Sequence, residues 1–151
     1  MEQGWFAYPL VVQPHHTDYA GIVWHGTYIA WMEEARVACL RSQNASFTDW
    51  LAAEVDLPVV DLALKYRQPL GLGDEALVKV RLLPLQGVRL IWEYDIQNRH
   101  TGNSCVGAQV TLAPVHVKTR KVLRRLPLPL MEDLQGIIAG PPSSPIIDRS
   151  I

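Results

Sequence analysis

Hydrophobic and polar residues alternate along four segments of the chain, in the two-residue repeat of a β-strand that buries one face. These segments are residues 59–67, 75–83, 88–98 and 104–113. A fifth strand is expected over residues 5–13, where Pro9 favours a sheet edge or a bulge because proline lacks the N–H that a central strand needs. Short turns rich in Gly, Pro and Asn separate the four segments, so we expect them to pair as antiparallel neighbours.

A helical repeat replaces the strand pattern over residues 27–42. At 100° per residue, one arc of about 120° holds Tyr28, Trp31, Met32, Ala35, Ala38 and Cys39. Ile29, Val37 and Leu40 cover much of the remaining circumference, which predicts a helix buried on nearly every side. A weaker helical pattern covers residues 128–134. The order of elements therefore predicts a single sheet wrapped around one central helix, with an outer sheet face that needs a partner subunit.

Length and composition indicate one compact domain, and they argue against a nucleic-acid-binding, membrane or secreted protein. The chain has 151 residues, 48% of them hydrophobic, and a formal net charge of −1. This balance argues against nucleic acid as a partner, because phosphate binding needs a surplus of basic residues. No apolar run reaches the roughly 20 residues that span a bilayer, so no membrane role is expected. Glu2 stands where a signal peptide carries a basic residue, and we expect a cytoplasmic protein with Cys39 and Cys105 reduced.

The C-terminal segment differs from the rest of the chain in composition. Residues 136–151 include a run of Gly, Pro and Ser that cannot build a packed element. We therefore expect a folded domain over residues 1–135 and a flexible C-terminal tail over residues 136–151.

The segment before the predicted helix concentrates side chains that can do chemistry. Residues 14–28 hold three of the five histidines together with Asp18. Asp18 precedes the helix by some seven residues, which is too far for a simple N-terminal cap. Four side chains of this segment are of types that bind metals: His15, His16, Asp18 and His25. Adjacent histidines on an extended chain, however, point to opposite sides and seldom share an ion. We therefore expect no metal site. Gly26 lets the backbone turn sharply or lets a ligand approach it closely.

These residues carry a family resemblance. The run from Thr17 to Tyr28, TDYAGIVWHGTY, with Trp31 and Glu34-Ala35-Arg36 after it, resembles the signature of the 4-hydroxybenzoyl-CoA thioesterase family. That family includes the acyl-CoA thioesterases associated with the Tol-Pal gene cluster. The likeness continues through the pattern Tyr66…Pro69…Gly73-Asp74 and covers roughly residues 5–130. It implies an α+β hotdog fold, in which an antiparallel sheet of about five strands wraps around one central helix.

The resemblance also implies roles for individual residues. Asp18 matches the catalytic aspartate, which acts as nucleophile or general base on the thioester. His25 matches the position whose backbone N–H, at the start of the helix, polarises the thioester oxygen; whether its imidazole takes part stays open. Gly26 and Tyr28 are expected at the substrate. The resemblance further implies that no cofactor is needed, since coenzyme A is part of the substrate, and that the protein is a homo-oligomer, either a dimer or a tetramer.

Two further residues are candidates for substrate binding. Glu33 falls between Ile29 and Val37 on the helical wheel, so its carboxylate either pairs with Arg36 or contacts a ring hydroxyl, as the matching acid does in aroyl-specific members of the family. Arg89 lies in a region where the family binds the coenzyme A phosphates.

Several substrates remain open at this point. The expected activity is hydrolysis of an acyl- or aroyl-CoA to the free acid and coenzyme A. The alternatives are a specialist for 1,4-dihydroxy-2-naphthoyl-CoA or 4-hydroxybenzoyl-CoA, and a non-catalytic protein that binds acyl-CoA.

Overall fold

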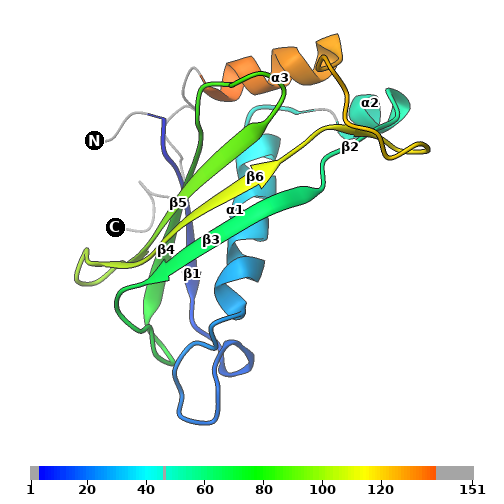
Figure 1. Cartoon of the computed structure of the whole chain (residues 1–151). Coiled ribbons are helices and arrows are strands. Elements are labelled where there is room, and N and C mark those ends of the chain that lie inside the picture. The colour runs from blue at the N-terminus through cyan, green and yellow to red at the C-terminus, as the bar shows by residue number, and fades with distance from the viewer. Residues whose placement is uncertain (1–3, 46, 139–151) are drawn as a thin grey trace.

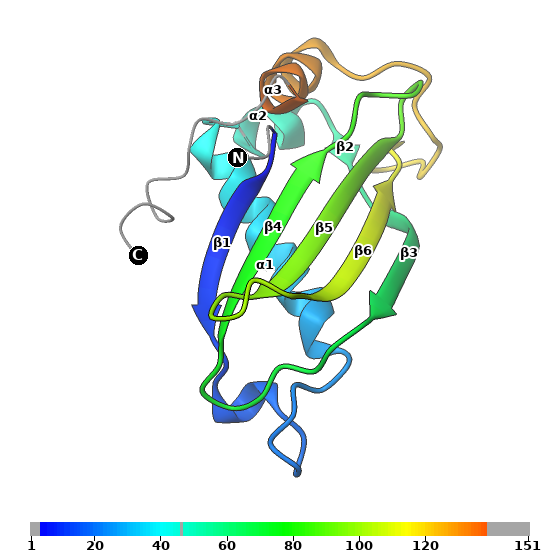
Figure 2. The ribbon, with the colours of Figure 1, turned by 90° about the vertical axis from the view of Figure 1, so that its left-hand side faces the viewer.

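The computed structural model describes residues 4–45 and 47–138, and its centre is a five-stranded antiparallel sheet (Figure 1). The strands lie in the order β1-β4-β5-β6-β3. Their bounds are Phe6–Val11 for β1, Val59–Tyr66 for β3, Glu75–Leu82 for β4, Leu90–Asn98 for β5 and Ser104–Leu112 for β6. Helix α1, Thr27–Ser42, crosses one face of this sheet (Figure 2). The predicted α+β arrangement of one sheet around one helix is confirmed.

Smaller elements gather at one end of the sheet. Helix α2, Phe47–Ala52, is followed by β2, Val55–Asp56, which pairs with β7, Val115–His116. Helix α3, Leu128–Ile138, lies across the same end, and the indole Nε1 of Trp50 in α2 donates to Asp133 in α3 at 2.8 Å (Figure 1). The sequence pattern did not predict α2, β2, β7 or the short 3₁₀ turn η1, Pro14–His16, because elements this short carry no measurable repeat.

Helix α3 starts where the sequence places it and ends later. It continues to Ile138 and buries Ile137, so residues 136–138 belong to the folded domain and not to a tail. The rest of the predicted tail, residues 139–151, lies outside the described residues.

One predicted strand pairing is wrong. Strands β3 and β4 are consecutive along the chain, yet β3 pairs with β6 and β4 pairs with β1 and β5. The connecting segment is bound to the residues that precede α1, where the Val23 N–H donates to Leu70 at 2.9 Å and Ile22 bridges to Gly71. Because of these contacts, the segment runs along the end of the sheet instead of turning back as a hairpin.

The core lies between α1 and the middle of the sheet. The buried side chains of α1 are Tyr28, Trp31, Met32, Ala35, Cys39 and Leu40. Those of β4 and β5 alternate with partly exposed ones, and they are Ala76, Val78, Val80, Leu82, Leu90, Trp92, Tyr94 and Ile96. The predicted period of two and the predicted helix face are therefore both confirmed.

One side of α1 and one strand of the sheet stay uncovered in the single chain. Ile29 and Val37 are 38% and 37% exposed, so the prediction of a helix buried on nearly every side is wrong for one chain. The helix packs on β4 and β1, which leaves the core face of β3 open. We call this surface the open strip; it consists of Ile29, Glu33 and Val37 of α1 and of Leu62, Leu64 and Tyr66 of β3. Leu62 pairs with Val110, and Val110 with the buried Trp92, which places the β3 row on the core face of the sheet.

Candidate active site

A short hairpin precedes α1 and carries Asp18. The Asp18 N–H donates to the carbonyl of Ile22 at 2.8 Å, and Gly21 turns the chain with a φ of +78°, a conformation that favours glycine. At its base, the Trp24 N–H and the Thr27 hydroxyl both donate to the carbonyl of His16, at 3.0 Å and 2.9 Å. The hairpin is therefore fixed to the start of the helix, while Tyr19 at its tip is fully exposed.

The Asp18 carboxylate has one oxygen held and one free. Its Oδ1 accepts the N–H groups of Ala20 at 2.9 Å and Ile22 at 3.3 Å. Among the described residues nothing donates to Oδ2, and the side chain is exposed. The carboxylate thus caps its own hairpin and does not cap helix α1. Its second oxygen is available to attack a carbon atom or to accept a proton.

The start of α1 has unpaired backbone donors. Gly26 is the N-cap residue and no side chain caps the helix there. Within the described chain, the N–H groups of His25 and Gly26 have no hydrogen-bond acceptor. Free N–H groups and the positive end of the helix dipole stabilise an anion at this position. The Tyr66 hydroxyl donates to the His25 carbonyl at 3.0 Å, which ties the end of β3 to the helix start.

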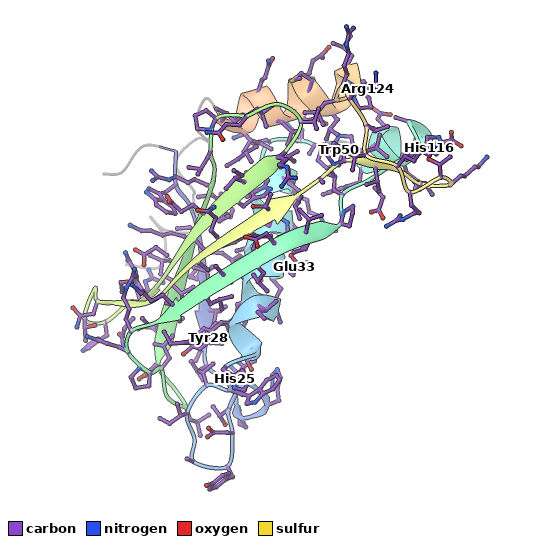
Figure 3. The ribbon with its side chains drawn as sticks, in the orientation of Figure 1. His25, Tyr28, Glu33, Trp50, His116 and Arg124 are labelled. Carbon is purple, nitrogen blue, oxygen red and sulfur yellow. The ribbon has the colours of Figure 1, made fainter. Side chains whose placement is uncertain are left out.

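A cavity of about 280 Å³ opens beside these donors. Its lining consists of Ile22, Val23, His25, Tyr28, Tyr66, Arg67, Gln68 and Pro69. The rings of Tyr28 and Tyr66 lie 5.8 Å apart and form one wall. Burial raises the pKa of Tyr28 to about 12, so its hydroxyl stays neutral at physiological pH. His25 and Tyr28 lie together at the end of the molecule where the hairpin emerges (Figure 3).

Trp24 explains why residue 26 is glycine. A Cβ atom on Gly26 would overlap the benzo ring of Trp24, whose side chain is 53% exposed. The Trp24 ring also lies 4.7 Å from that of His25. The absence of a side chain at Gly26 therefore lets an aromatic ring lie directly on the helix start, next to the free N–H groups.

Glu33 forms the predicted ion pair. Its carboxylate pairs with Arg36, and the Arg36 guanidinium donates to the Tyr94 hydroxyl at 3.0 Å. The Glu33 side chain is 50% exposed, so the expectation that it sits inside an apolar sector is wrong in the single chain. The reason is the open strip, on which Glu33 lies between Ile29 and Val37.

Arg89 does not reach this site within one chain. Val11 pairs with Glu75 at the hairpin end of the sheet, and Leu82 pairs with Trp92 at the opposite end. Arg89 directly precedes β5, so it lies at that opposite end, about 25 Å away along an eight-residue strand. This distance could not be predicted from the motif, because the distance depends on the register of the β4–β5 pair.

The histidines are arranged differently from what an extended chain predicts. His15 and His16 lie in the 3₁₀ turn with ring centroids 4.1 Å apart, so they do not point to opposite sides. His16 Nδ1 accepts the Gln13 N–H at 2.9 Å, and burial lowers the pKa of His16. The described part of the chain contains no group of three His, Cys, Asp or Glu side chains placed to share a metal ion.

Residues that line the cavity were partly missed by sequence reasoning. The segment after β3 contributes three lining residues, Arg67, Gln68 and Pro69. Tyr66 also lines the cavity, and its hydroxyl binds the His25 carbonyl at the helix start. The signal was available, because the pattern from Tyr66 to Pro69 belongs to the family resemblance. No role was assigned to it, since only the folded chain brings residue 66 next to residue 25.

Comparison with known proteins agrees with the fold. Residues 12–138 match the model of the thioesterase-like superfamily, and the chain belongs to that family. It is 47% identical over 130 residues to the Synechocystis protein named "Putative esterase sll0410", covering 86% of this chain and 78% of that one. It is 27% identical over 117 residues to the acyl-CoA thioester hydrolase YbgC of Escherichia coli, covering 76% and 87% of the two chains.

Solved structures show the same architecture. Slr0204, a 1,4-dihydroxy-2-naphthoyl-CoA thioesterase from Synechocystis, superposes with a TM-score of 0.78 at 23% identity and covers 87% of this chain and 96% of its own. At this identity the likeness establishes the hotdog fold. Among the described residues, no helix has the length and apolar character needed to cross a membrane.

Proposed function

We propose that this protein is an acyl-CoA thioesterase whose active site joins the Asp18 carboxylate to the free N–H groups of His25 and Gly26. The observation that carries the proposal is the pairing of these two features at one end of the molecule. One is a carboxylate oxygen without a donor, and the other is a helix start without a cap. A thioester needs such a combination, because attack on its carbonyl carbon moves negative charge onto the carbonyl oxygen.

The reaction consumes one water and needs no other reactant. With Asp18 as base, the carboxylate takes a proton from water while the water oxygen attacks the carbonyl carbon. The N–H groups of His25 and Gly26 stabilise the resulting oxyanion. Collapse breaks the C–S bond, and the departing coenzyme A thiolate takes up the proton. With Asp18 as nucleophile, a mixed anhydride forms first and water then cleaves it to the same acid.

Acyl groups fit the site better than hydroxylated aroyl groups. An aroyl specialist needs an acid that is available to the ring hydroxyl, whereas the Glu33 carboxylate is engaged by Arg36, which is itself held by Tyr94. The relative YbgC is by name an acyl-CoA thioester hydrolase. A role restricted to binding is disfavoured, because a purely binding site gains nothing from an unpaired carboxylate beside the thioester.

The proposed enzyme works as a homo-oligomer. In one chain Asp18 is exposed and the cavity is open to water, whereas electrostatic stabilisation of the oxyanion needs a water-poor site. Pairing the β3 edges of two chains about a two-fold axis would cover the open strip. It would also reverse the partner, so that the end of the sheet with Arg89 in one chain faces the hairpin end of the other. This is how Arg89 would reach coenzyme A phosphates.

A substrate panel tests the proposal. Purified protein is incubated with acetyl-, hexanoyl-, lauroyl-, benzoyl- and 4-hydroxybenzoyl-CoA, and release of free thiol is followed with a chromogenic disulfide. We expect turnover of the aliphatic substrates, and loss of that turnover in Asp18→Asn. Hydrolysis of the hydroxybenzoyl substrate alone would contradict the acyl preference. No thiol release from any thioester, with binding of acyl-CoA retained, would contradict the enzymatic function.

A further inference from the structure

A second cavity lies at the other end of α1. Its volume is about 400 Å³, within the range typical of small-molecule pockets. It is lined by the last turns of α1, by α2, β2 and α3, and by the ends of β5 and β6, and it is open to solvent on one side. Figure 3 shows Trp50, which lines this cavity, at the opposite end of the helix from His25, with Glu33 between them.

The lining of this second cavity is apolar and its charges are satisfied. Leu40, Leu57 and Leu134 are typical of the wall, and Arg36 and Asp56 are its only charged members in the described chain. Arg36 pairs with Glu33 and donates to Tyr94, and Asp56 accepts the Arg120 guanidinium at 2.7 Å. No lining charge is left to bind an ionic group. A predominantly apolar wall of this kind favours hydrocarbon over an ionic group.

The open strip joins the two cavities. Tyr66 and His25 lie at one end of it, in the wall of the first cavity, and Val37 lies at the other end, in the wall of the second. Ile29, Glu33 and Val37 are spaced by four residues, so they share one side of α1. The distance from Gly26 to Val37 along the helix axis is about 16 Å, which is comparable to the length of an extended medium or long acyl chain.

We infer that the second cavity receives the end of the substrate's acyl chain and that it gives the enzyme a preference for long aliphatic chains. The inference rests on the proposed thioesterase function. With the thioester carbonyl at the N–H groups of His25 and Gly26, the chain runs along the open strip beneath the partner subunit and ends among Val37, Leu40 and Leu57. Each methylene that becomes buried there raises kcat/KM by about fourfold.

The ion pair in the middle of the strip shapes the expected chain-length profile. A chain that ends at Glu33 and Arg36 covers charged groups and gains little from burial. An acyl chain that extends past this ion pair reaches the second cavity, where burial of its last methylenes raises kcat/KM again. We therefore expect kcat/KM to rise little from butyryl- to hexanoyl-CoA and steeply from octanoyl- to lauroyl-CoA.

The test fills the second cavity and measures the ratio of kcat/KM for lauroyl-CoA to that for acetyl-CoA. Leu57→Trp fills it from the half-buried segment before β3, and Leu51→Trp fills it from α2, where the leucine is 70% exposed and the fold tolerates a larger side chain. Leu128→Trp is the matched control, because Leu128 is 69% exposed on another helix and lines neither cavity. All variants are assayed as intact oligomers that are folded by circular dichroism.

We expect the ratio to fall at least about fivefold in a folded cavity variant and to stay at the wild-type value in Leu128→Trp. A smaller fall in both cavity variants, or an equal fall in the control, would overturn the inference. Wild-type protein that hydrolyses acetyl-CoA but not lauroyl-CoA would also overturn it and leave the proposed function standing. Absence of hydrolysis with every thioester would instead count against the proposed function itself.

Discussion

At the residue scale, Asp18 serves the fold and the chemistry with different oxygens. Oδ1 accepts two N–H groups of its own hairpin, and Oδ2 is left for a substrate or a water molecule. Asparagine at this position keeps a carbonyl oxygen for the hairpin and loses the negative charge. The structure therefore separates the two roles in a way that a single substitution can test.

We expect Asp18→Asn to keep the fold and to lose at least about 10²-fold in kcat, the usual cost of removing a general base. Thiol release from the best substrate measures the loss, and the thermal midpoint checks the fold. Glu132→Gln, the same chemical change at an exposed position on α3, serves as the control and should match wild type. A folded Asp18→Asn protein with more than about a tenth of the wild-type turnover would rule out the assigned role.

Gly26 is the second residue whose change has a defined result. Alanine is compatible with the backbone there, where φ is −76° and ψ is −22°, but its Cβ overlaps the Trp24 ring. The ring must shift from the helix start, and we expect kcat/KM to fall by roughly tenfold or more because the surroundings of the free N–H groups change. Gly136→Ala is the control, since nothing lies within 4 Å of its added Cβ. Equal activity of the two variants would show that the free N–H groups at the helix start take no part in the reaction.

The family resemblance points to these residues through a motif that is local. Asp18, His25, Gly26 and Tyr28 lie within eleven positions of one another, so the spacing alone brings them to one helix start. Tyr66 is equally part of the site, but its place depends on β3 lying beside that helix start. The distance of Arg89 from this site within one chain could not be predicted for the same reason, because the register between β4 and β5 sets it.

At the scale of elements, the long repeats and the β4–β5 and β5–β6 pairings were predicted, and the place of β3 was not. The predicted helix has the observed bounds Thr27–Ser42, and each of the four strand segments is within two residues of an observed strand. A two-residue repeat fixes which face a side chain lies on and is silent about which strand lies next to it. The position of β3 at the edge beyond β6 depends on contacts between the loop after β3 and the residues before α1.

Helix α1 is held to the sheet by a polar contact that has a pH-dependent consequence. The Tyr94 hydroxyl accepts from Arg36 beneath the helix, and burial raises the pKa of Tyr94 to about 12. Burial likewise raises the pKa of Tyr28 to about 12. A tyrosine whose pKa is raised by folding contributes full stability below its ordinary value of 10.0, and that contribution is lost as the pH rises towards 12.

We therefore expect the free energy of unfolding, measured with urea, to fall between pH 10 and pH 12. Tyr94→Phe should fall less steeply over this interval, because one of the two buried hydroxyls is gone, and should be less stable at neutral pH by about 1–3 kcal/mol because Arg36 loses an acceptor. Tyr19→Phe is the control, since Tyr19 is fully exposed and its loss should leave the curve unchanged. A Tyr94→Phe curve as steep as that of wild type would contradict the burial of that hydroxyl.

At the scale of the whole molecule, a single chain leaves its site open. The open strip exposes Leu62 and Tyr66 on the core face of an edge strand, and an unprotected edge of this kind invites pairing. The sequence predicted a need for a partner at the outer sheet face, and the structure adds an uncovered apolar row on the core face of β3. Pairing of two β3 edges would bury this surface, and each Å² of apolar area removed from water would stabilise the dimer by about 25 cal/mol.

A charge on the open strip should separate the subunits. We expect Leu62→Lys to lower the mass measured by light scattering towards that of one chain and to reduce activity at least about tenfold, because a lysine ammonium cannot be buried unpaired in the interface. Leu128→Lys, at a residue 69% exposed on α3, should retain both the mass and the activity. A Leu62→Lys protein that stays an oligomer with full activity would place the subunit contact elsewhere.

The central claim is that this thioesterase hydrolyses acyl-CoA at a site that two chains complete together. The most direct test is a dilution series of the wild-type protein in which light scattering and the initial rate of thiol release are measured on the same samples. We predict a mass of at least twice 17.0 kDa wherever the protein is active, and a specific activity that falls in step with any dissociation. A fully active species of 17.0 kDa would contradict the account.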